Sequence, residues 1–81
     1  MTSPLIEQSP TWREALRRGD GLEVARDPDD GAQLWGVFAH IPEGGVEWVA
    51  DFSTRAWAAA YATSVIDNYP NLGWHGVTVY E

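Results

Sequence analysis

The chain has 81 residues, which suits one domain and leaves too little chain for a second hydrophobic core. Hydrophobic residues make up 44% of it and include five Trp, three Tyr and two Phe, a composition that excludes a disordered segment. Twelve acidic residues stand against five basic ones, all of them Arg, and the resulting net charge of −7 opposes direct binding to nucleic acid or to an anionic membrane.

The first segment, residues 1–9, is expected to form a flexible arm ahead of a single domain that spans residues 10–81. A short helix follows the arm. Thr11 and Glu14 have the spacing of a capping box at its start, and Gly19 is placed to end it. Because so short a helix is marginal on its own, we expect packing against the rest of the domain to hold it.

Three strands are predicted next, separated by turns rich in Gly, Pro and acidic residues. They cover residues 22–26, 33–40 and 46–52. A longer helix is expected from an N-cap at Ser53 to about residue 68, where Pro70 stops it, and a fourth strand covers residues 74–80. This αβββαβ order predicts an α+β fold with an antiparallel-rich four-stranded sheet and the long helix packed on one face.

The alternation of side chains along the strands predicts which face of the sheet the long helix covers. The apolar set expected beneath that helix is Leu34, Phe38, Trp48 and Phe52. The opposite set contains Trp35, Val37 and Val49, which make that face too apolar to stay in water. We therefore expect the first helix or a second copy of the chain to cover it.

The acidic residues after the first strand form the most ligand-like pattern in the sequence. Asp27, Asp29 and Asp30 resemble the start of a calcium-binding loop. An EF-hand loop that begins at Asp27 needs Gly at its sixth position and Glu at its twelfth, whereas this sequence has Gly31 fifth and Phe38 twelfth. The pattern is that of a solvated hairpin turn, and no metal site is expected there.

The chain has only two histidines, His40 and His75, which stand at strand ends and lack the spacing of a metal-ligand motif. There is no Cys, and no Ser lies in a nucleophile elbow. We therefore expect no catalytic residue, no cofactor and no metal. A small enzyme or ligand binder that uses His40, His75 and nearby carboxylates is an alternative that the residues leave open.

Small size, acidity, and the lack of both Cys and a catalytic constellation make the chain similar, at the level of a class, to the small acidic inhibitors of phages and mobile elements, of the anti-CRISPR or anti-restriction type. The resemblance implies a non-catalytic protein that docks a basic surface of a partner protein, such as a nucleic-acid-binding groove. Aromatic anchors would hold the partner while carboxylates steer the encounter. The predicted partner-binding residues are Asp27, Asp29, Asp30, Trp35, Glu47 and Asp51.

The alternative function is that of a small structural or accessory subunit that forms a homodimer. In either case we expect a cytoplasmic location. No apolar run approaches the ~18–20 residues of a membrane span, and the first residues lack the basic region and apolar core of a signal peptide.

Overall fold

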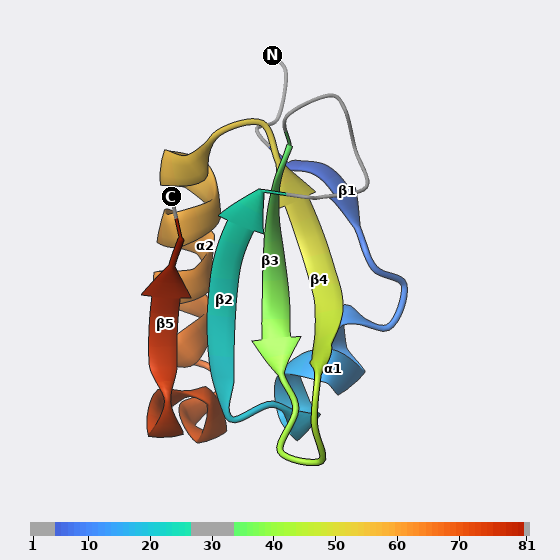
Figure 1. The fold of residues 1–81 in the computed structure, drawn as a ribbon, viewed down its shortest axis with the longest axis vertical. Helices are drawn as coiled ribbons and strands as arrows, with labels where there is room; N and C mark the ends of the chain where they lie inside the picture. The colour runs from blue at the N-terminus through green and yellow to red at the C-terminus, as the bar shows by residue number, and fades with distance from the viewer. Residues whose placement is uncertain (1–4, 27–33, 81) are drawn as a thin grey trace.

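The computed structural model describes residues 5–26 and 34–80. Its elements, in chain order, are β1 (Leu5–Gln8), α1 (Trp12–Arg18), β2 (Gly21–Arg26), β3 (Trp35–His40), β4 (Val46–Phe52), α2 (Arg55–Ile66), the 3-10 helix η1 (Pro70–Trp74) and β5 (Gly76–Val79). The predicted α+β class is confirmed. Figure 1 shows one sheet with both α-helices on its rear face.

The sheet has five strands in the order β1-β4-β3-β2-β5, one strand more than predicted. The additional strand is β1, which comes from the segment expected to be a flexible arm. It pairs antiparallel with β4, with Leu5 opposite Phe52 and Gln8 opposite Ala50. The free edge of β4 satisfies the backbone groups of a segment that is too short to signal a strand by its own pattern.

The last strand, β5, lies at the other edge and runs parallel to β2, while all other neighbours are antiparallel. It begins at Gly76 and not at residue 74, because Pro70 starts the 3-10 helix η1 between α2 and β5. Gly76 has a φ of +70°, a conformation that favours glycine, and it turns the chain from η1 into the strand.

Both helix starts differ in detail from the prediction. Thr11 is the N-cap of α1, but its side chain makes no capping hydrogen bond, so the predicted capping box is wrong. The Oγ of Ser9 instead accepts a hydrogen bond of 3.2 Å from the backbone N–H of Thr11. In α2 the N-cap is Thr54, one residue after Ser53, and its side chain accepts from the N–H of Trp57. Gly19 ends α1, as predicted.

The hydrophobic core lies between the sheet and the two helices. Its buried members include Leu22 and Val24 of β2 and Val37 and Ala39 of β3. These four residues are paired across the strands, Leu22 with Ala39 and Val24 with Val37, so their side chains share the face that the helices cover. On that face the ring of Phe52 packs against Tyr61 of α2, with the ring centroids 5.1 Å apart.

The predicted assignment of side chains to the two faces of the sheet is wrong for β3 and for part of β4. In β3 the helices cover Val37, not Phe38, because Val37 pairs with the buried Val24. In β4 the register shifts between Trp48, which is opposite Phe38, and Ala50, which is opposite Val37. Val49 is the extra residue of this bulge and is fully buried with Ala50, so the alternation breaks there.

The face that bears Trp35, Val37 and Val49 was expected to be covered by the first helix or by a second copy of the chain, and in the structure α1 and α2 together cover it. Val37 and Val49 have no exposed surface, and both belong to the single core cluster. The helices thus occupy the part of this face around Val37 and Val49 on which a second copy was expected to pack. Among the described residues, no helix is both long and apolar enough to cross a membrane.

Candidate functional site

One face of the sheet is left uncovered by the helices, and we call it the open face. Its members follow from cross-strand pairing, because residues directly opposite each other project to the same side. Three rows result: Glu23–Phe38–Trp48, Gly21–His40–Val46, and Gly36–Asp51–Glu7. The front of the sheet in Figure 1 is this face.

An aromatic pair forms the centre of the open face. Phe38 and Trp48 lie directly opposite each other on β3 and β4, and both side chains are half-buried although no described element packs over them. The Phe38 ring covers the backbone of Gly36, where an added Cβ would lie 2.7 Å from the ring. Gly36 therefore allows Phe38 to lie flat along the sheet, which presents one side of an aromatic ring outward.

Asp51 holds the second member of this pair. Its Oδ1 accepts a hydrogen bond of 3.0 Å from the indole Nε1 of Trp48. Asp51 is only 5% exposed, so its carboxylate serves this contact within the sheet surface. This hydrogen bond thus fixes the orientation of the indole.

All five Arg residues lie away from the open face. Arg13, Arg17 and Arg18 belong to α1, which packs on the opposite side of the sheet. Arg26 and Arg55 lie over the ring of Trp35, at 5.4 and 5.9 Å from its centroid. The open face consequently has Glu7 and Glu23 at its surface and no Arg.

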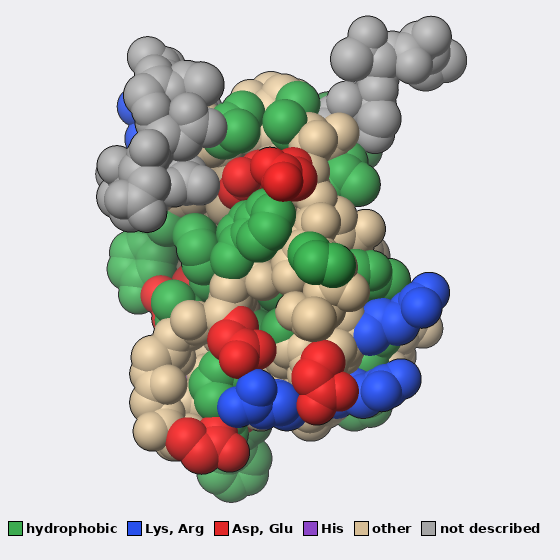
Figure 2. Space-filling view, turned by 90° about the vertical axis from the view of Figure 1, so that its right-hand side faces the viewer, with side chains coloured by type: hydrophobic (Ala, Val, Ile, Leu, Met, Phe, Trp, Pro, Cys, Tyr) green, Lys and Arg blue, Asp and Glu red, His purple; other side chains and the backbone are tan. Residues whose placement is uncertain are grey.

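The side of the molecule that bears β1 has a different character. Figure 2 shows basic side chains gathered low on this side, next to acidic ones, with hydrophobic side chains above them. Here Arg18 pairs with Glu47 at 3.0 Å, and both side chains are more than 40% exposed. Local pairing of this kind reduces the negative field around Glu47.

The three predicted partner-binding residues that the structure describes, Trp35, Glu47 and Asp51, do not share one exposed surface. Asp27, Asp29 and Asp30 lie outside the described residues. Trp35 is half-buried on the helix side of the sheet, below two Arg side chains. Of the two sheet carboxylates, Glu47 is paired with Arg18 and Asp51 is buried, so neither is a free acidic group for a partner.

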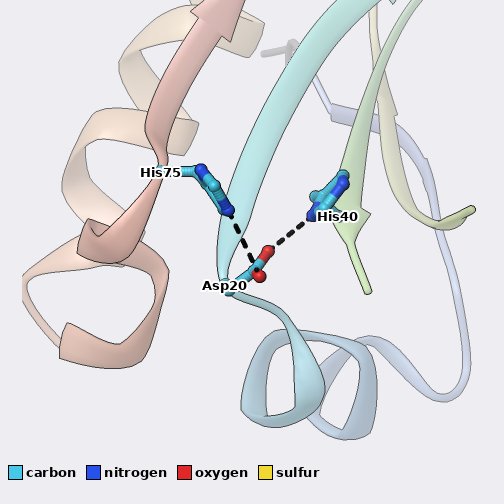
Figure 3. A group of neighbouring side chains, drawn as sticks. All are labelled: Asp20, His40 and His75. Carbon is cyan, nitrogen blue, oxygen red and sulfur yellow. Dashed lines mark hydrogen bonds and ion pairs between the residues drawn. The ribbon is translucent and has the colours of Figure 1, made fainter. Parts of the chain in front are cut away.

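The structure brings His40 and His75, which the sequence analysis named together with nearby carboxylates, next to Asp20, which it did not single out. Asp20 precedes β2, His40 ends β3 and His75 precedes β5, and all three meet at one end of the sheet (Figure 3). The Oδ1 of Asp20 is 2.6 Å from Nδ1 of His40, and its Oδ2 is 3.5 Å from Nε2 of His75. The two imidazole rings are edge to face, with centroids 5.3 Å apart.

A shallow depression of about 230 Å³ extends from this cluster along β2 and β5. Glu23, His40, His75, Thr78 and Tyr80 line it together with the backbone at Gly21 and Gly76. It offers carboxylate, imidazole and hydroxyl groups within one recess at the border of the open face.

Comparisons of the chain with protein-family models, curated proteins and solved structures gave no match.

Proposed function

We propose that the protein is a non-catalytic binding module that docks the basic surface of a partner protein on its open face. The observation that carries this proposal is the row Glu23–Phe38–Trp48, which combines two outward-facing aromatic rings with a carboxylate on a face that lacks Arg. The net charge of −7 favours a partner of opposite sign.

The aromatic pair supplies the anchor in this proposal. Trp and Phe are large, lose little conformational freedom on binding, and are typical of the central residues of protein interfaces. Because Trp48 is already oriented by Asp51, little further ordering is required when the partner binds. Trp48 and Phe38 thus take the anchoring role that the sequence analysis gave to Trp35.

The exposed carboxylates of the open face steer the encounter with the basic partner. Glu7 and Glu23 lie on either side of the aromatic pair, on β1 and β2. Exposed charges in such positions act mainly on the association rate, and salt screens them over about 8–10 Å. A nucleic-acid-binding groove is one basic surface of the required kind, so an inhibitor that occupies such a groove is the biological role that we propose.

The experiment that tests this function selects partners without presuming one. A library of random peptides is displayed and sorted on the immobilised protein. We expect the enriched peptides to carry an excess of Arg and Lys, and to lose binding to the Phe38→Ser variant. Trp57→Ser is the matched control, because Trp57 is 55% exposed on α2 and its loss should leave binding unchanged.

The kinetics of a selected peptide separate steering from anchoring. Glu23→Gln should slow association and weaken its salt dependence, while Trp48→Phe should speed dissociation. Peptides without a basic excess, or peptides that respond to Trp57→Ser and not to Phe38→Ser, would show that the proposal is wrong. Light scattering that finds a dimer abolished by Phe38→Ser would instead support a self-associating subunit.

A further inference from the structure

Asp20, His40 and His75 are held together by their backbones as well as by their side chains. The N–H of Asp20 donates to the carbonyl of His40 at 2.9 Å, and the N–H of His75 donates to the carbonyl of Asp20 at 2.8 Å. These two bonds tie three distant parts of the chain at one point. The side chains therefore start from fixed positions, which lowers the cost of gathering them around a ligand.

Gly21 keeps His75 close to this point. A Cβ at position 21 would lie only 2.8 Å from the Cβ of His75 and 3.2 Å from the carbonyl oxygen of Gly76. Only glycine permits this approach of β5 to the start of β2. The residue next to Asp20 thus has a direct effect on where the imidazole of His75 stands.

The three side chains offer donor atoms in the arrangement of a metal site. One ligand atom from each lies within 4.8 Å of the other two. Ligands about 2.1 Å from a tetrahedral ion lie about 3.4 Å from one another, so small side-chain rotations convert this cluster into a coordinating set. Asp20 is one-fifth exposed while the two histidines are about half exposed, which leaves the imidazoles free to make these rotations.

The donor types identify the class of ion. Imidazole nitrogen suits Zn²⁺ and its neighbours in the first transition row, whereas Mg²⁺ and Ca²⁺ prefer sites made of oxygen alone. Three protein ligands complete the set of an open site and leave a coordination position for water or a further group. Two of the three ligands, His40 and His75, line the depression that Glu23, Thr78 and Tyr80 also line.

We propose that Asp20, His40 and His75 bind one first-row divalent transition-metal ion, of the Zn²⁺ class. The site is distinct from the aromatic anchor of the open face and does not depend on the proposed protein-binding function. The proposal rests on three ligand side chains that lie close together, and on the backbone hydrogen bonds that already hold these residues in place.

Calorimetric titration of the untagged full chain with Zn²⁺ tests the site directly, because a histidine tag would itself bind the ion. We expect one Zn²⁺ per chain, retained in the presence of excess Mg²⁺. Titration with Co²⁺ should produce a visible absorption spectrum of a low-coordinate site. His75→Ala and His40→Ala should each weaken Zn²⁺ binding by more than about 10-fold, since even the loss of a group that only hydrogen-bonds to a metal ligand reaches that size.

Two further variants distinguish coordination of Zn²⁺ by these ligands from an effect of net charge and from a loss of folding. Asp67→Asn removes one carboxylate from the exposed end of α2 and should leave Zn²⁺ affinity unchanged. Gly21→Ala keeps all three ligands but displaces His75, so it should weaken binding and alter the Co²⁺ spectrum. Circular dichroism without metal confirms that each variant is folded, and His75→Ala changes only an exposed side chain.

The proposal fails if the folded wild-type protein binds neither Zn²⁺ nor Co²⁺ at millimolar concentration. It also fails if Asp67→Asn lowers Zn²⁺ affinity as much as His75→Ala does, because binding would then reflect net charge alone. A normal Zn²⁺ titration by Phe38→Ser, which removes the aromatic anchor, would show that the metal site stands apart from the partner-binding face.

Discussion

The indole N–H of Trp48 and the carboxylate of Asp51, three residues later on β4, are joined by a hydrogen bond of 3.0 Å. The bulge at Val49 makes this contact possible: the two residues are three positions apart, yet both side chains project to the open face. In an undistorted strand, residues at this spacing point to opposite faces. The contact fixes an aromatic ring and gives a buried carboxylate a charge-assisted partner.

A double-mutant cycle on this pair should give a clear coupling energy. Because hydrogen bonds to charged groups contribute about 1.5–3 kcal/mol, Trp48→Phe and Asp51→Ala should each destabilise the protein, while the double variant loses less than their sum by about 1–2 kcal/mol. Urea unfolding of the four proteins measures this energy. Additive effects, within about 0.5 kcal/mol, would mean that the hydrogen bond contributes little to stability.

Neighbouring residues of β3 provide a test of the corrected side-chain parity. Val37 is fully buried against the helices and Phe38 is half-buried on the open face. Val37→Ser buries a hydroxyl and leaves a cavity, so it should cost about 3 kcal/mol, whereas Phe38→Ser should cost about 1 kcal/mol. Thermal unfolding compares the two, and a larger loss for Phe38→Ser would restore the parity expected from the sequence.

The pattern of the sequence located α1, α2 and the three central strands because each has a local cause. The apolar spacing of α2 and the glycine that ends α1 act within a few residues. The edge strands have no such signal. Leu5–Gln8 is a strand because β4 offers it a free edge, and Gly76–Val79 is parallel to β2 because η1 redirects the chain. Both depend on tertiary neighbours.

The bulge at Val49 explains the error in predicting the covered face. Strict alternation places Trp48 with Phe52, but one extra residue moves Trp48 to the other side. In β3 both faces are apolar, so the pattern alone did not choose between Val37 and Phe38. Ala58 and Ala62 of α2 belong to the same buried cluster as Val37 and Ala39, whereas Phe38 lies on the open face.

The cluster of Asp20, His40 and His75 had no signal in sequence spacing, since 20 residues separate the first two and 35 the last two. Its one hint was that both histidines lie at strand ends. Whether two strand ends meet depends on strand order and direction, and β5 was not expected to be parallel. Once β5 lies parallel beside β2, Asp20 and His75 necessarily stand next to each other.

Asn71 links η1 to the end of α1, and its loss should destabilise both. Its Nδ2 donates to the carbonyl oxygens of Leu16 and Gly19, each at 2.8 Å, which caps carbonyls that α1 itself leaves unpaired. Asn71→Ala should cost about 1–3 kcal/mol, or several degrees in Tm for a chain of this size. Asn71→Asp should cost more, because it places a negative charge at the negative end of the helix dipole.

Hydrogen exchange locates the destabilisation caused by Asn71→Ala, since the amides of α1 should lose protection before those of β3. Asn68→Ala is the matched control, because Asn68 is exposed at the end of α2. A loss of stability in Asn68→Ala equal to that in Asn71→Ala would show that the link to α1 has no particular role.

Tyr61 predicts how stability depends on pH in the alkaline range. Burial raises the pKa of its phenol above the ordinary 10.0, with the nearby Gln8 opposing the rise and Tyr69 adding to it. The unfolded chain therefore gives up this proton at a lower pH than the folded chain does. The contribution of the protonated Tyr61 phenol to the stability of the folded state is fully present below about pH 10. It is lost as the pH rises through the higher pKa of the folded state.

Urea unfolding at a series of pH values from neutral to strongly alkaline should show this decline, and Tyr61→Phe should reduce it. At neutral pH the same variant should be as stable as the wild type or more stable by up to about 1 kcal/mol. The reason is that the Tyr61 hydroxyl is buried and no hydrogen bond of good geometry satisfies it within the described residues. Tyr80→Phe, a change at an exposed tyrosine, should leave the pH dependence intact. A neutral-pH loss above about 1 kcal/mol in Tyr61→Phe would show that the hydroxyl has a stabilising partner and that burial alone does not govern its ionisation.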